Sequence, residues 1–121
     1  MSGLKKRVLV SVPASIGNVG PGFDVLGMAL DNLLDHFNIG VCTGESRIEL
    51  VGGVDAADVP LDPQENLVTI AAEAMSHHLK KPSKFSVSIE RQLPISGGLG
   101  SSAAASLAGS LGAARLLAAA R

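Results

Sequence analysis

Hydrophobic and polar residues alternate near the start of the chain, and this period of two predicts a β-strand from Arg7 to Val12. Pro13 is expected to end the strand, because proline lacks the backbone N–H that a strand ladder uses. Glycine and proline then recur between residues 17 and 22, which predicts a loop with little regular structure.

Further along the chain, residues 37–41 alternate in the same way, and residues 48–50 follow after a Thr-Gly-Glu turn at 43–45. Two alternating runs joined by a short glycine-containing turn predict a β-hairpin. The stretch 51–60 has the composition of a surface loop. A last alternating run, residues 85–90, predicts another strand.

Between residues 62 and 81, apolar residues recur at the spacing of a helix. Asp62, followed by Pro63 and Glu65, resembles a helix start, and Asn66 is a competing cap. The two lysines at the end of this segment suit a helix C-terminus, and the proline after them is expected to stop the helix. The face expected to be buried carries Leu67, Ile70, Ala71, Ala74, Met75, His78 and Leu79.

Alanine, leucine and glycine dominate the last twenty or so residues and predict a second helix that starts at Ser101 or Ser102. Leu107, Leu111 and Ala114 share one of its faces. Apolar residues occur all round it, which is typical of a buried helix. Strands and helices are mixed along the chain without regular βαβ alternation, so the expected fold class is α+β.

Composition narrows the functional classes. The 121 residues are 46% hydrophobic and 17% charged, as in a globular domain, and the net charge of −1 excludes the basic field expected of a nucleic-acid partner. Cys42 is the only cysteine, so the chain has no disulfide framework and no zinc cluster. We expect this thiol to be a small buried group in a strand.

Neither end of the sequence indicates a membrane partner. The N-terminal residues lack the long apolar region and cleavage site of a signal peptide. The C-terminal helix is rich in Ala and Gly and contains Arg115, unlike a membrane span. The expected location is cytoplasmic.

Three glycines and three serines lie between the last predicted strand and the last predicted helix. Glycine lets backbone N–H groups approach an oxyanion closely, and a helix start directs free N–H groups and the positive end of its dipole at the same place. This combination predicts a phosphate cradle and therefore a bound nucleotide. The residues expected to contact it are Pro94, Ile95, Ser96, Gly97, Gly98, Leu99, Gly100, Ser101, Ser102, Ala103 and Ala104.

Other glycine-rich patterns fit this segment less well. A Walker A loop needs Gly-Lys-Ser/Thr, and no lysine follows Lys84. Gly98, Gly100 and Ala103 fit the dinucleotide fingerprint G-x-G-x-x-A, but residues 91–96 separate them from their strand. On the pattern alone, a glycine-rich turn into a capped, packed helix stays an alternative.

The pattern Pro94-x-x-x-Gly98-Leu99-Gly100-Ser101-Ser102-Ala103 resembles the phosphate loop of the GHMP kinases without a gap. A second segment, PASIGNVGPGFDVLGMAL from Pro13 to Leu30, is similar to the N-terminal signature of the homoserine-kinase branch of that family. The Gly-Glu-His-type signature of galactokinase and mevalonate kinase is missing there. The resemblance covers the whole chain, but only the first part of a family member.

The resemblance implies that residues 1–121 form the N-terminal, ATP-binding domain of these kinases, with a fold like domain 2 of ribosomal protein S5, incomplete and truncated before a ferredoxin-like C-terminal domain. It implies ATP and Mg²⁺, with Ser102 as a metal ligand beside a glutamate from a later segment. It also implies that Asp24 meets the ammonium group of an amino-acid substrate and Asn18 its hydroxyl end. Simple turn chemistry is the alternative for Asn18 and Asp24.

Asn66-Leu67-Val68 resembles the segment that contacts adenine in the family, through Asn66 and Val68. A helix cap followed by core residues is the alternative. His77 and His78 point about 100° apart on a helix and have no third ligand at a suitable spacing, which favours ordinary surface histidines over a metal site. No residue stands out as a general base.

The resemblance implies ATP-dependent phosphorylation of the hydroxyl of L-homoserine, on the path to threonine, with a homodimer left open for the full-length protein. Two alternatives remain. One is a truncated nucleotide-binding fragment without catalysis, since the acidic metal ligand and second domain are missing from this chain. The other is a different small-molecule kinase of the GHMP family.

Overall fold

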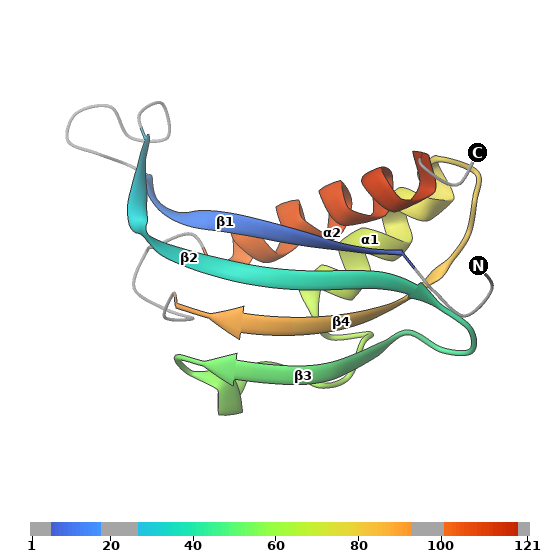
Figure 1. The fold of residues 1–121 in the computed structure, drawn as a ribbon, viewed down its shortest axis with the longest axis horizontal. Helices are drawn as coiled ribbons and strands as arrows, with labels where there is room; N and C mark the ends of the chain where they lie inside the picture. Colours follow the sequence, from blue (N-terminus) through green and yellow to red (C-terminus); the bar gives the residue numbers. More distant parts are fainter. Residues whose placement is uncertain (1–5, 18–26, 93–100, 119–121) are drawn as a thin grey trace.

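The computed structural model describes the backbone of residues 6–17, 27–92 and 101–118, and the side chains of residues 6–13, 34–92 and 103–118. One four-stranded sheet is covered on one face by two helices (Figure 1). Strand β1 begins and helix α2 ends at the same end of the molecule (Figure 1). The elements are β1 (Arg7–Gly17), β2 (Gly27–Cys42), β3 (Arg47–Gly53), the 3₁₀ turn η2 (Ala56–Asp58), α1 (Leu67–His78), β4 (Lys84–Arg91) and α2 (Ser101–Ala118).

The strand order in the sheet is β1-β2-β4-β3. Strand β2 pairs antiparallel with β1 and β4, whereas β3 pairs parallel with β4. The hairpin expected between residues 41 and 48 is therefore wrong, because β4 lies between the two strands. Phe85, Val87 and Ile89 are all buried, which suits β4 to this central position. The connection through α1 supplies the crossover that a parallel pair requires.

Strand β1 does not end at Pro13, as the sequence led us to expect, but continues to Gly17. The register shifts at this point, since Pro13 lies opposite Leu34 and Ala14 opposite Leu30. Pro13, which lacks a backbone N–H, thus lies at an irregularity in the pairing of β1 with β2 and does not end the strand. The glycine-rich loop expected after this strand lies largely outside the described residues.

The core lies between the sheet and the two helices. Phe37 and Ile39 of β2 are fully buried in it, as are Phe85 and Val87 of β4. Helix α2 covers them with small side chains and two leucines: Ala104, Ala105, Ala108, Ala113, Leu116 and Leu117.

The expected faces of both helices were wrong. On α2, Leu107 is 48% exposed and Leu111 is 50% exposed. On α1, Leu67 and Ile70 are also exposed. The residues buried on α1 are instead Val68, Thr69, Ala72 and Ser76.

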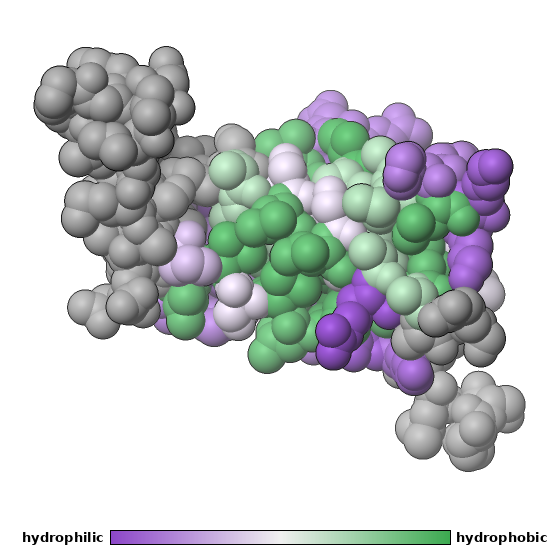
Figure 2. All heavy atoms as spheres, turned by 90° about the horizontal axis from the view of Figure 1, so that it is seen from above, coloured by the Kyte–Doolittle hydropathy of each residue, from purple (hydrophilic) through white to green (hydrophobic). Residues whose placement is uncertain are grey.

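Close packing of α1 against α2 explains which faces of the two helices are buried. A Cβ on Gly109 of α2 would overlap the carbonyl oxygen of Val68 and lie 3.0 Å from the nitrogen of Ala72. The two helices therefore approach each other through small residues, and the larger leucines lie outside the contact. Seen from above, hydrophobic side chains gather across the middle of the surface, and hydrophilic ones gather towards the end where β1 begins and α2 ends (Figure 2).

Two smaller expectations agree with the structure. Cys42 is a free, buried thiol at the end of β2. Within the described part of the chain, no helix is long and apolar enough to cross a membrane.

Candidate functional site

The described residues that flank the two sequence motifs lie at one end of the molecule. Strand β1 ends at Gly17 and β2 begins at Gly27 there, and β4 ends and α2 begins at the same end, opposite the start of β1 and the end of α2 (Figure 1). The segments 18–26 and 93–100, which hold most of both motifs, are therefore attached to the fold at one end. The described residues to which both motif segments are attached therefore lie at the same end of the fold.

Helix α2 begins at Ser101, as expected from the sequence. Its first turn contains no acidic residue, so no side-chain carboxylate there offsets the positive end of the helix dipole. The first N–H groups of a helix have no partner within it. An anion beside this turn would therefore meet unpaired donors and a favourable potential.

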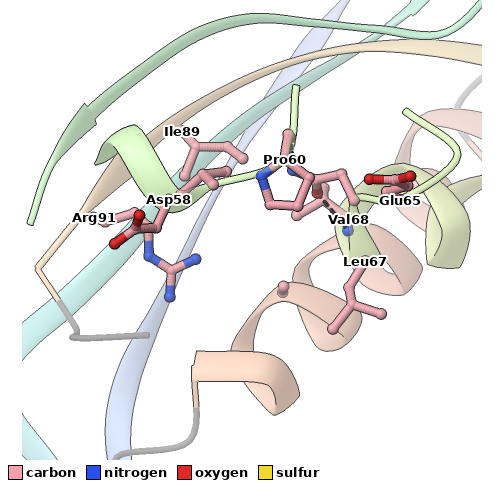
Figure 3. Close-up of a pocket in the computed structure, with 10 residues that line it drawn as sticks. Asp58, Pro60, Glu65, Leu67, Val68, Ile89 and Arg91 are labelled. Atoms are coloured by element: carbon pink, nitrogen blue, oxygen red, sulfur yellow. Dashed lines mark hydrogen bonds between the residues drawn. The ribbon is translucent and has the colours of Figure 1, made fainter. Parts of the chain in front are cut away.

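A pocket of about 250 Å³ lies between the approach to α1, the end of β4 and the beginning of α2 (Figure 3). Ligand sites for drug-sized molecules measure roughly 300–1,000 Å³. The pocket is therefore suited to one ring system, such as a base, rather than to a whole nucleotide. Its walls are formed by Asp58, Val59, Pro60, Glu65, Asn66, Leu67, Val68, Ile89, Arg91 and Ala105.

Asn66 caps α1 and ties it to the preceding loop. Its Oδ1 accepts a hydrogen bond of 2.9 Å from the Val68 backbone N–H, and its Nδ2 donates one of 2.9 Å to the Pro60 carbonyl oxygen. The helix therefore begins at Leu67 with Asn66, and not Asp62, as its cap, and the cap interpretation is confirmed. One Nδ2 hydrogen and one Oδ1 lone pair remain for a ligand.

Val68 belongs to the core and also lines the pocket. Its exposed fraction is 1%, so it can contribute an apolar wall but little accessible area. Ala104 is likewise buried, whereas Ala103 is exposed. The nucleotide contacts of these residues remain predictions.

Arg91 is a residue of this pocket that the sequence reasoning missed. Its side chain is 7% exposed and forms an ion pair with Asp35, which is completely buried, at 3.0 Å between Nη2 and Oδ2. Its Nε and Nη2 donate no hydrogen bond of good geometry to the described part of the chain. The Arg91 guanidinium lies on the side of the pocket towards α2 (Figure 3).

A pattern in the sequence could have revealed this pair. Asp35 continues the inward-facing positions of Phe37 and Ile39 on β2, and Arg91 continues those of Val87 and Ile89 on β4. A charged residue on each of two buried strand faces indicates a partner across the sheet. What the sequence could not supply was the register between these strands.

The structure also describes the two histidines and Arg7, whereas several predicted site residues lie outside its described part. His77 and His78 are exposed, and no group of three or more metal-binding side chains occurs among the described residues. Arg7 donates hydrogen bonds to the side chains of Asn38 and Ser86 across the sheet. Outside the described residues lie Asn18, Asp24 and positions 94–100, and outside the described side chains lie Ser101 and Ser102.

Comparison with known proteins gives consistent results. Residues 66–120 match the family described as the GHMP kinases N-terminal domain. The homoserine kinase of a Synechococcus species is 43% identical over 109 residues, which cover 88% of this chain and 35% of that protein. The chain thus spans about a third of the length of the curated relatives it matches.

Solved structures share the fold. The crystal structure of a homoserine kinase from Cytophaga hutchinsonii matches with a TM-score of 0.84 and 33% identity, over 94% of this chain and 36% of that one. The mevalonate kinase of Methanococcus jannaschii matches with a TM-score of 0.67 and 19% identity, over 93% of this chain and 41% of that one, which is a likeness of fold alone. These matches confirm the kinase fold expected from the sequence.

Proposed function

We propose that this chain belongs to the GHMP kinases and provides the nucleotide site and part of the substrate site of an ATP-dependent homoserine kinase. The reaction transfers the γ-phosphoryl group of ATP to the side-chain hydroxyl of L-homoserine. The observation that carries the proposal is the attachment of both sequence motifs at one end of the fold, beside the start of α2 and the Asn66 pocket.

The nucleotide half of the proposal rests on described geometry. The pocket offers apolar walls for a base, and Arg91 offers buried donors to acceptor atoms of the nucleotide. The first N–H groups of α2 have no partner within the helix and would serve as donors to phosphate oxygens. The segment 94–100, which enters this helix, supplies the remaining backbone donors in the proposal.

The substrate half rests on the second motif and on the relatives. Asp24 is proposed to bind the ammonium group of homoserine and Asn18 to lie near its hydroxyl. Both belong to the segment between β1 and β2, which is attached at the same end as the phosphate motif. The Synechococcus and Cytophaga hutchinsonii relatives, at 43% and 33% identity, are both named homoserine kinases.

Phosphoryl transfer asks the protein mainly for positioning and for neutralisation of charge. Mg²⁺ would supply part of that neutralisation, with the Ser102 hydroxyl as a proposed ligand. A hydroxyl oxygen suits this hard cation, although the ion keeps several waters or carboxylates as further ligands. The described residues contain no acidic cluster that could replace them.

A substrate panel tests this function. The complete gene product is assayed for ADP release with ATP, Mg²⁺ and either homoserine, mevalonate, galactose or shikimate. We expect turnover with homoserine and little with the others. Preference for another alcohol would favour a different branch of the family, and ATP binding without any turnover would favour a non-catalytic nucleotide-binding protein.

A further inference from the structure

Asp35 connects β2 with the point at which the chain leaves β4 for the phosphate motif. Its Oδ1 accepts a hydrogen bond of 2.8 Å from the Gln92 backbone N–H, and its Oδ2 lies 3.0 Å from Arg91 Nη2. The side chain of Gln92 also contacts β2, since its Oε1 accepts a 2.8 Å hydrogen bond from the Leu34 backbone N–H. Two adjacent residues of β2 thus hold Arg91, the last residue of β4, and Gln92, which follows it.

The cost of this arrangement indicates a role beyond stability. Asp35 and Arg91 are both buried, and removing two charges from water costs several kcal/mol per ion. Apolar residues of similar volume would often stabilise a fold as well or better. Yet the pair lies one residue from the last described position before the phosphate motif, and Arg91 lines the pocket.

We propose that Asp35 is a positioning residue for the nucleotide site. Its carboxylate holds the Arg91 guanidinium through Nη2, so that Nε stays available to acceptor atoms of the bound nucleotide. It also fixes the backbone at Gln92, from which the phosphate motif starts. The inference rests on the proposed binding of ATP, but not on the identity of the phosphate acceptor.

The first test separates charge from backbone anchoring in the complete gene product. Asp35→Asn keeps an oxygen for the Gln92 N–H but removes the charge that holds Arg91. We expect the KM for ATP to rise about tenfold, equivalent to about 1.4 kcal/mol, with the KM for homoserine nearly unchanged. Glu73→Gln is the matched control, because it breaks the partly buried ion pair with Lys84 away from the pocket. It should lower the melting temperature without changing the KM for ATP.

The second test uses Arg91. Arg91→Lys preserves the charge facing Asp35 but removes the fork of donors, so we expect a stable protein with a raised KM for ATP. This variant serves even if Asp35→Asn fails to fold. The double variant Asp35→Asn/Arg91→Met removes both charges, and should regain stability over Asp35→Asn while keeping the raised KM for ATP.

A purely structural pair would behave differently. In that case the melting temperature alone would change, and the KM for ATP of every folded variant would equal that of the wild type, which would overturn the inference. If the wild type shows no homoserine-dependent turnover, the proposed function fails, and calorimetric binding of ATP to the same variants decides this inference separately. A wild type that binds no ATP would overturn it.

Discussion

Gly109 of α2 lies against the backbone of Val68 on α1, with no room between them for a side chain. A Cβ at position 109 would overlap the Val68 carbonyl oxygen and meet the Ala71 Cβ at 3.0 Å. Val68 in turn lines the pocket beside Asn66. The spacing of the two helices and the shape of the candidate nucleotide pocket are therefore set by the same contact.

This contact predicts different effects of alanine at two glycines of α2. Gly109→Ala should destabilise the fold by about 1–3 kcal/mol, because the obstructing atoms belong to the backbone of α1 and cannot move aside. At Gly112 the nearest atom is Ile39 Cδ1, at 2.7 Å, the end of a flexible side chain. Gly112→Ala should be nearly neutral, or gain up to about 1 kcal/mol of helix propensity.

Thermal unfolding of the two variants provides the measurement. If both substitutions lower the melting temperature equally, the backbone of α1 beside Gly109 is no greater obstacle to a side chain than Ile39 is beside Gly112. If neither does, the helices are less tightly packed than the structure indicates.

Asn66 has a capping role that can be separated from nucleotide binding. Asn66→Ala should cost about 1 kcal/mol through loss of the cap, and should also weaken ATP binding. Asn66→Ser retains a capping oxygen but loses the amide, so we expect near wild-type stability with weaker ATP binding. Melting temperatures and ATP dissociation constants for both variants make the comparison. Wild-type ATP affinity in the serine variant would limit Asn66 to its structural role.

Sequence patterns predicted where the strands and helices of this fold lie better than they predicted which strands pair with each other. The alternation at 37–41 and 85–90 lies within real strands. Asn66, the competing cap, is the actual cap of α1, and α2 begins at Ser101, one of the two expected starts. The hairpin after Cys42 failed because alternation says which face of a strand is buried but not which strand lies beside it. The pairing of β4 between β2 and β3 depends on contacts far apart in sequence.

The helix faces failed for a related reason. Leu107 and Leu111 are more hydrophobic than the alanines and glycines that are buried, and a periodic pattern favours the larger residues. The distance between α1 and α2 reverses that order, because only small residues fit at Gly109. In the candidate site, the motifs indicated the phosphate segment directly. Arg91 and Asp35 could not be recognised as a pair from the sequence, because their contact depends on the register between β2 and β4.

Gly100→Val tests the phosphate motif. A branched side chain in the glycine-rich segment would stand where a phosphate is expected to approach the backbone. We expect ATP binding to be lost while the circular dichroism spectrum and the melting temperature change little. Unaltered ATP affinity would remove the assignment of this segment as the phosphate cradle.

Asp24→Asn tests the substrate assignment. A lost charge-assisted hydrogen bond is worth about 1.5–3 kcal/mol, so homoserine should bind roughly tenfold to a hundredfold more weakly, and ATP should bind almost as before. Separate titrations of the two ligands distinguish them. An equal loss of both affinities would instead indicate that Asp24 supports the fold.

The direct measurement of the central claim is the identity of the phosphorylated product. The complete gene product is incubated with ATP, Mg²⁺ and L-homoserine, and the phosphorus-containing species are followed by ³¹P NMR, with Gly100→Val as the matched inactive control. We expect a phosphate monoester on the homoserine side-chain oxygen to grow in step with ADP, and to be absent with the variant. Formation of ADP and inorganic phosphate alone, or a monoester that forms equally with Gly100→Val, would contradict the account.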